Sequence, residues 1–428
     1  MKDKVFYAIV CAIAFFSMAS ATPVFASNLN WQPYLVTEDV LFPSLILSTN
    51  NLDFDKILDR PQREDYLGDS AGLYGIKIKN PANDTKIFVT ITIDGLSEAS
   101  SYEGVLPVAG QEYTVVPSMR YKADALWKIK QPYPTTIIYS VTLNDAPPQK
   151  LTKKLSVRSV NDVPFGFMQN GKHYDTSLLF AAFVNENSPV IENILQDALE
   201  HNAVQSFNGY SGDRQQVLRQ VFAIWNSLQR HGVQYSNIVT PSGLSKNIYS
   251  QHVRLPDESY DNSQANCVDG SVLIASALYK IGMCPVLVMR PGHMFLGVYN
   301  DRESCERRTL QNITFIETTA VGAVRLNALQ KKWKFKTDDG YLSSVSYASL
   351  TDASNHATRQ FNQMVPALNT KQKGYYLLDI TQIRNAGIIP ISSVISTERE
   401  VDTIVQEPHY PTPKQIIKGA GGSMIVQY

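Results

Sequence analysis

The chain has 428 residues, of which 44% are hydrophobic and 18% are charged, with 39 basic and 39 acidic side chains. This length and apolar content are enough for two or three domains that each bury a sizeable core. The formal net charge of zero gives no electrostatic basis for binding nucleic acid or an anionic membrane surface, so the composition argues against both classes of partner.

The start of the chain is typical of a secretory signal peptide. Lys2 and Lys4 precede an apolar run over residues 5–16, and small residues follow up to Ala21 or Ala26, the two expected cleavage sites. The run is shorter than the roughly 20 apolar residues that cross a bilayer, and no later stretch approaches that length. The sequence therefore predicts an exported protein, periplasmic or secreted, without a transmembrane segment.

Residues 73–159 show the pattern of an all-β domain. Short runs rich in β-branched and aromatic residues alternate with turn clusters that contain Asn, Asp and Pro. In one run, Ile87, Val89, Ile91 and Ile93 alternate strictly with other residues, so one face of that strand should pack inward. We expect an immunoglobulin-like β-sandwich, serving either as a stabilising spacer or as a binding surface for a partner in the cell envelope.

The hydrophobic period becomes helical after about residue 175. Helices are expected over 189–200 and 214–229, the second with an apolar face spaced three and four apart. Because the change of period marks a boundary, residues up to about 160 are expected to fold independently. The predicted organisation is a signal peptide at 1–26, a β-sandwich domain at 27–160, a catalytic domain at 161–390 and an irregular tail at 391–428.

Cys267 stands at the start of a predicted buried helix. Residues 268–281 are apolar on nearly all sides, run too long for a strand and stop at Gly282, as helices do. Unpaired N–H groups and the positive end of the helix dipole favour a thiolate at such a start. Cys267 is therefore a candidate nucleophile, and the alternative is a small buried hydrophobic residue.

A histidine and a carboxylate follow on strands. The β-rich runs 284–289 and 293–299 are joined by turn residues and predict a hairpin, with His293, a candidate general base, opening the second strand. A third run places Glu317 near a strand end, where its carboxylate can orient the imidazole through a hydrogen bond. Asp379 is a second candidate for this orienting acid, although capping a short helix is its commoner use.

The order of these elements over about residues 210–325 resembles the transglutaminase-like superfamily of papain-type cysteine enzymes. Cys267, then His293 with an aromatic two positions on, then Glu317 followed by threonine match the family's three motifs in turn. The acid is glutamate where the family usually has aspartate. The resemblance implies an α+β fold with a papain-type catalytic domain. It also implies cysteine-dependent acyl transfer at an amide of a protein or peptide substrate, as a peptidase or amidase or as a transglutaminase.

Such a reaction needs hydrogen-bond donors for the oxyanion of its tetrahedral intermediate. The backbone N–H of Cys267 is the first expected donor because helix-start amides are unpaired, and the side chain of Gln264 is a candidate second donor. We expect no cofactor, and no metal site because the histidines lack ligand spacing. The alternative function is a binding or structural protein of the envelope that keeps the fold without turnover.

The cysteines predict one disulfide and one free thiol. Signal removal takes away Cys11 and leaves three cysteines in an oxidising compartment. Cys284 stands at the start of the first strand of the hairpin and Cys305 comes shortly after the end of the second, and such ends lie side by side in an antiparallel hairpin. Cys267 is expected about 25 Å from Cys284, at the other end of its helix. A Cys284–Cys305 bond should therefore leave Cys267 free; two unpaired cysteines are the alternative.

Overall fold

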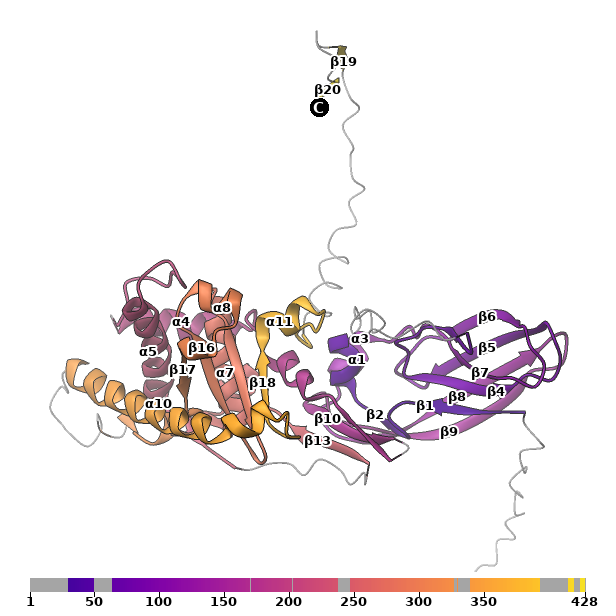
Figure 1. Cartoon of the computed structure of the whole chain (residues 1–428), viewed down its shortest axis with the longest axis horizontal. Coiled ribbons are helices and arrows are strands. Elements are labelled where there is room, and N and C mark those ends of the chain that lie inside the picture. Colours follow the sequence, from indigo (N-terminus) through magenta and orange to yellow (C-terminus); the bar gives the residue numbers. More distant parts are fainter. Residues whose placement is uncertain are drawn as a thin grey trace, which may run out of the picture.

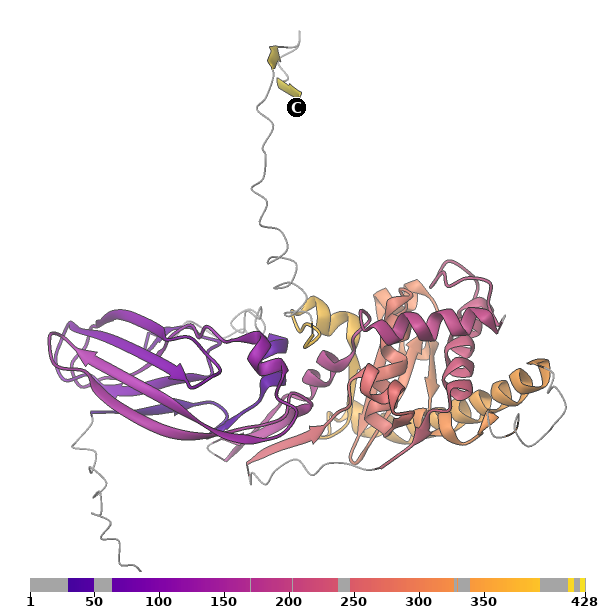
Figure 2. The same ribbon diagram turned by 180° about the vertical axis from the view of Figure 1, so that it is seen from behind.

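The computed structural model describes residues 30–49, 64–169, 171–201, 203–237, 247–326, 329, 339–392, 415–418 and 424–427. The expected signal peptide lies outside the described residues. Helices and sheets are both present, as the α+β prediction requires. A β-rich part lies at one end of an elongated molecule and a mixed helical and sheet part at the other (Figures 1 and 2).

Two sheets make up the β-rich part. The first has the order β1 (Trp31–Leu35), β4 (Tyr74–Lys79), β7 (Glu112–Val116), β3 (Tyr66–Gly68). The second has the order β2 (Val40–Leu41), β9 (Gln149–Val157), β8 (Tyr133–Leu143), β5 (Thr85–Ile93), β6 (Ser100–Leu106). The strands predicted from composition are all present, and β6, which has little apolar alternation, was not among them.

The inner faces of these sheets share one core. In β5 the four alternating residues at 87, 89, 91 and 93 are buried to 1% exposure or less, whereas the intervening Phe88 is 43% exposed. The predicted inward face is therefore confirmed. Trp31 of the first sheet lies 6.2 Å from Tyr139 of the second, measured between ring centroids, so the aromatic side chains of both sheets meet in this core.

The core continues across the predicted domain boundary near residue 160. Helix α1 (Pro43–Thr49), from the N-terminal part, contacts strand β10 (Asp162–Gln169) and the 3-10 helix η1 (Ser177–Phe183). The hydroxyl of Ser44 donates to the carbonyl of Asp162 at 2.5 Å. Figure 1 shows α1 and α3 (Ala123–Trp127) between the two ends of the molecule. The described residues before 160 therefore bury part of their surface against the rest of the chain.

The second part is built on the antiparallel sheet β17-β16-β15-β18. Its strands are β15 (Pro285–Arg290), β16 (His293–Tyr299), β17 (Ile313–Ile316) and β18 (Tyr376–Asp379). The side chains of alternate residues in each strand point to opposite faces of the sheet. Leu287 and Leu296 pack in the core that contains helix α7 (Cys267–Lys280), whereas Val288 and Phe295 pack with Phe361 of helix α10 (Asp339–Asn369). The sheet is thus covered by a helix on each face.

Two further predicted helices pack beside α7. They are α4 (Pro189–Glu200) and α5 (Arg214–His231), and both lie close to the expected ranges. The Asp213 carboxylate caps the start of α5 by accepting from the Gln216 amide at 2.8 Å. Gly232, with φ of +94°, ends the helix in the left-handed conformation that glycine tolerates best.

Short elements complete the described structure. They are β11 (Lys172–Asp175) and β13 (Ile248–His252), which flank β10; the parallel pair β12 (Gln234–Tyr235) and β14 (Gln264–Ala265); α6 (Pro256–Asp261), α8 (Arg302–Arg307), η2 (Leu310–Asn312), η3 (Thr318–Gly322) and α11 (Ile380–Asn385). The tail expected to be irregular contains a hairpin of β19 (Gln415–Lys418) and β20 (Met424–Gln427). Among the described helices, none has the length and apolarity needed to cross a bilayer.

Candidate active site

Helix α7 begins at Cys267, as predicted, because its first turn is closed by reciprocal capping. The side chain of Asn266 accepts from the amides of Val268 and Asp269 at 2.8 and 3.0 Å. The Asp269 carboxylate in turn accepts from the Asn266 amide at 3.1 Å. These bonds fix the backbone on both sides of Cys267, whose side chain is partly exposed.

The carboxylate of Asp269, two residues after Cys267, is buried, and Arg254 compensates its charge. Arg254 donates to it from the guanidinium at 2.8 Å and from the backbone amide at 2.9 Å. Burial raises the pKa of Asp269, while the hydrogen bonds and the charge of Arg254 oppose that shift. The ion pair therefore reduces the repulsion that an isolated carboxylate would exert on a thiolate at Cys267.

Helix α7 is joined directly to the segment that carries Glu317. The carbonyl of Cys267 accepts from the hydroxyls of Ser271 at 2.7 Å and Thr318 at 3.3 Å. The two elements pack closely here: a Cβ atom built on Gly270 would be in ordinary van der Waals contact with the Cβ of Thr318, at 3.4 Å. The position of Cys267 relative to the acid-bearing segment is thus set by side-chain hydrogen bonds between the two elements.

His293 and Glu317 meet at the end of the sheet. His293 is the first residue of β16, and Glu317 directly follows β17, which pairs with β16. The Nε2 atom of His293 lies 2.8 Å from a carboxylate oxygen of Glu317. Glu317 is 5% exposed and also accepts from the hydroxyl and the amide of Thr319. The structure therefore brings together the histidine and the acid that the sequence singled out.

Cys267 is the third member of the cluster, because its side chain interacts with His293 and affects the pKa of the imidazole. Hydrogen bonds with Cys267 and Glu317 raise the pKa of His293 to about 9, although burial of the ring opposes this shift. Burial raises the pKa of Glu317, but its hydrogen bonds with His293 and Thr319 and the histidine charge outweigh that effect and hold the pKa below the usual range. The arrangement favours an imidazolium at His293 beside an ionised Glu317.

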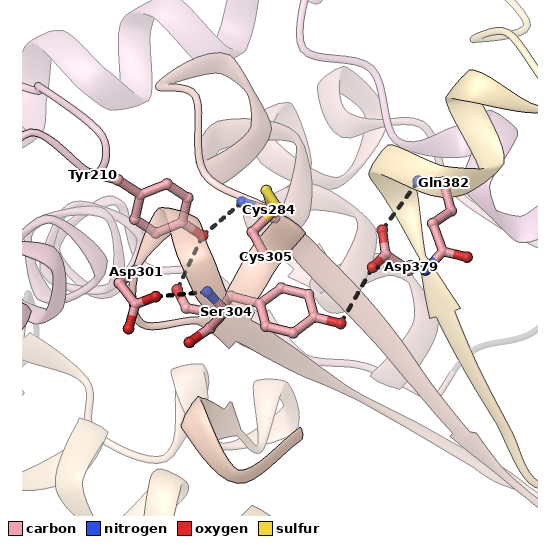
Figure 3. Close-up of a disulfide and its surroundings, with 8 residues drawn as sticks. Tyr210, Cys284, Asp301, Ser304, Cys305, Asp379 and Gln382 are labelled. Atoms are coloured by element: carbon pink, nitrogen blue, oxygen red, sulfur yellow. Dashed lines mark hydrogen bonds between the residues drawn. A yellow bond between two sulfur atoms is a disulfide. The ribbon is translucent and has the colours of Figure 1, made fainter. Parts of the chain in front are cut away.

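Asp379, the second candidate for the orienting acid, has a different role. Its carboxylate accepts from the Gln382 amide at 3.1 Å and caps α11, and the hydroxyl of Tyr299 donates to it at 3.3 Å (Figure 3). In the sheet, Asp379 is opposite Val286, whereas His293 is opposite Arg290 at the other end of β15. Glu317, not Asp379, is therefore the hydrogen-bonding partner of His293.

The two expected oxyanion donors are placed differently. The backbone amide of Cys267 makes no hydrogen bond to another group in the described part of the chain, so it is free to donate. Gln264 lies in β14, two residues before the cap, and its side chain is exposed. The contact of the Gln264 side chain with an oxyanion would form only when substrate is bound, so its role as a second donor stays a prediction.

Three residues of the site escaped sequence reasoning. The side-chain amide of Gln360, on α10, donates to the Glu317 carboxylate at 2.7 Å, and its Oε1 atom accepts from the Arg290 guanidinium at 3.2 Å. Tyr235 of β12 lies near the cluster: burial first, then the charges of Cys267 and Glu317, raise the pKa of this phenol. Polar residues spaced four apart on α10, such as His356 and Gln360, were only a weak indication that this face of the helix borders a site. No local pattern in the sequence links Gln360 to Glu317.

The predicted disulfide is present. Cys284 and Cys305 are bonded, with their Cα atoms 6.0 Å apart (Figure 3). Among the described residues, Cys267 is the free cysteine. Tyr210 supports the same region, since its hydroxyl accepts from the Cys284 amide at 2.9 Å and donates to the Tyr299 carbonyl at 3.0 Å. The bond thus ties the start of β15 to α8, which follows the strand that carries His293.

In the described residues, no group of three or more His, Cys, Asp or Glu side chains is arranged to hold a metal ion. The site therefore consists of a thiol, an imidazole, a carboxylate and their hydrogen-bonding partners. Comparison of the chain with protein-family models and with curated proteins finds no match. The assignment to the transglutaminase-like superfamily accordingly stays a prediction based on the residues.

Proposed function

We propose that this chain is an exported cysteine-dependent enzyme that transfers acyl groups from amide bonds, through a triad of Cys267, His293 and Glu317. The contact that carries the proposal is the 2.8 Å hydrogen bond between His293 and Glu317, with the side chain of Cys267 also within hydrogen-bonding reach of the imidazole. A histidine with a purely structural role would not require a thiol at a helix start next to it, so the presence of Cys267 favours a catalytic role. The transglutaminase-like catalytic domain and the immunoglobulin-like sandwich belong to the same proposal.

The chemistry follows from the charge state of the pair. The thiolate of Cys267 attacks the amide carbon, forming a C–S bond and placing the negative charge on the carbonyl oxygen. When the C–N bond breaks, the imidazolium of His293 gives its proton to the departing amine. Water or a second amine then attacks the carbonyl carbon of the thioester and gives up a proton to His293. The C–S bond breaks, the acyl group leaves on the new nucleophile, and the thiolate and imidazolium are restored. Glu317 holds the ring throughout and stabilises its charged form.

The start of helix α7 is proposed to increase the rate by stabilising the oxyanion of the tetrahedral intermediate. The free amide of Cys267 can donate to the oxygen, and the positive end of the α7 dipole favours its charge. Gln264 is the proposed second donor. Removal of one such donor typically costs about a hundredfold or more in rate, so Gln264→Ala tests this assignment separately from the triad.

Thiol reactivity distinguishes this enzyme from a binding protein that has kept the fold without turnover. In a chain from which the expected signal peptide with Cys11 has been removed, Cys267 is the free cysteine of the described residues, so iodoacetamide modification reports on it. We expect alkylation near neutral pH much faster than that of an ordinary thiol, and loss of that rate in His293→Gln. A rate typical of a buried, unactivated thiol would contradict the proposal. Mass analysis of reactions with peptidoglycan peptides and envelope proteins would then identify hydrolysis or transfer.

A further inference from the structure

A cavity of about 670 Å³ opens beside the histidine, between the β15–β16 turn, η3 and α10. His293 and Glu317 form one end of its wall together with Arg290 and Gln360, and Asp352 and Ser349 of α10 form part of the remainder. Neither Cys267 nor Gln264 lines it. The cavity therefore lies on the histidine side of the reactive thiol.

The direction of proton transfer assigns this cavity to one half of the substrate. In the proposed reaction the departing amine receives its proton from His293, so the leaving half of the substrate must extend past the imidazole. We propose that this cavity binds the leaving-group half of a polypeptide substrate and that Asp352 selects a basic side chain within it. The inference rests on the proposed function, and it names the substrate class for that site.

The charges along the cavity give the bound peptide a direction. Asp352, His356 and Gln360 are spaced four apart, so they lie along one face of α10. Gln360 is engaged by Arg290 and Glu317, whereas Asp352 and His356 are exposed and have no hydrogen-bonding or ionic partner among the described residues. A guanidinium thus lies at the histidine end and an unpaired carboxylate at the far end.

The spacing sets where the basic residue falls. Eight helical positions separate Asp352 from Gln360, which corresponds to about 12 Å at a rise of about 1.5 Å per residue. An extended peptide advances about 3.3 Å per residue, so the side chain that meets Asp352 belongs to the third or fourth residue after the scissile bond. At the other end, Arg290 can donate to peptide carbonyl groups next to that bond.

The first test measures binding without turnover. The probes are the amides of Ala-Ala-Lys-Lys and Ala-Ala-Glu-Glu, and saturation-transfer NMR measures their affinities for the full chain carrying Cys267→Ala. We expect the lysine peptide to bind about fivefold more tightly, the upper range for an exposed ion pair. Adding Asp352→Lys should reverse the preference. Adding Thr351→Lys, which places the same charge on an exposed neighbour outside the cavity, should leave it unchanged.

Equal affinities for the two peptides, no binding of the lysine peptide, or the same preference with Asp352→Lys would overturn the inference. A second test separates this failure from that of the proposed function. When the wild-type chain cleaves a mixture of denatured proteins, the new N-termini should carry Lys or Arg at their third or fourth position. Cleavage without that enrichment refutes the Asp352 site and supports the proposed enzyme. Selective binding of the lysine peptide without any acyl transfer supports recognition by Asp352 and refutes the proposed enzyme.

Discussion

The imidazole of His293 and the carboxylate of Glu317 are joined at 2.8 Å although they come from different strands. The antiparallel pairing of β16 with β17 places Leu296 opposite Ile316, so the residue after β17 lies near the beginning of β16. Glu317 is then held by Thr319 and Gln360 as well. An acid with this many donors has a fixed orientation, which in turn fixes the ring of His293.

Glu317→Gln is expected to lower the rate of amide turnover by about a hundredfold or more while the protein stays folded. The amide keeps the size of the side chain but removes the charge that stabilises the imidazolium. Turnover and the rate of Cys267 alkylation should fall together, and circular dichroism should be unchanged. Loss of solubility in this variant would instead show that Glu317 is mainly structural.

Gln360→Ala is expected to reduce turnover by about tenfold, because Glu317 loses a 2.7 Å donor and the link to Arg290. Gln363→Ala is the matched control, since Gln363 is an exposed residue of the same helix. The pH dependence identifies the mechanism: a positioning residue should change the pH at which activity falls, and Gln360→Asn should recover part of it. Equal rates in both alanine variants would exclude a positioning role.

The pH dependence of stability follows from the raised pKa of His293, which goes from 6.5 to about 9 on folding. Because the folded state holds this proton more tightly, the stabilisation is complete below about pH 6.5 and is lost between 6.5 and 9. The difference in thermal midpoint between the wild-type chain and His293→Gln should therefore shrink as the pH rises from 6 to 9.5. If this difference in thermal midpoint instead grew as the pH rose, the prediction that folding raises the pKa of His293 would be wrong.

Local patterns in the sequence were sufficient for the elements that carry the three residues of the proposed triad. The Gly292 turn predicted the hairpin with His293 at its second strand, and the apolar run up to Gly282 predicted the helix that begins at Cys267. The contacts of Gln360 were not predictable, because they depend on how a distant helix packs on the sheet. The sequence also predicts a helix over 355–368, and the structure extends that helix back to Asp339, where its early turns lack a clear apolar stripe.

The disulfide is expected to stabilise the sheet without taking part in the chemistry. Closing a loop of about 20 residues should contribute about 3 kcal/mol, so Cys284→Ser with Cys305→Ser should lower the thermal midpoint by about 6–10 °C. At temperatures below unfolding, Cys267 alkylation should change little, since Cys267 is on a different element. The double variant is preferable to a reducing agent, whose thiols would compete in the alkylation assay. An unchanged midpoint would contradict the prediction.

The fragment 161–428 tests the boundary that the change of hydrophobic period predicted. The buried ion pair of Arg158 with Asp162 at 2.7 Å lies across that boundary, and Asp162 is also 3.0 Å from His252. Removing Arg158 leaves a buried carboxylate without its guanidinium, and removing α1 exposes the apolar side of η1. We therefore expect the fragment to unfold at a lower temperature than the full chain, by more than Arg158→Ala alone accounts for. A fragment with the midpoint and the Cys267 reactivity of the full chain would show that the two parts fold independently.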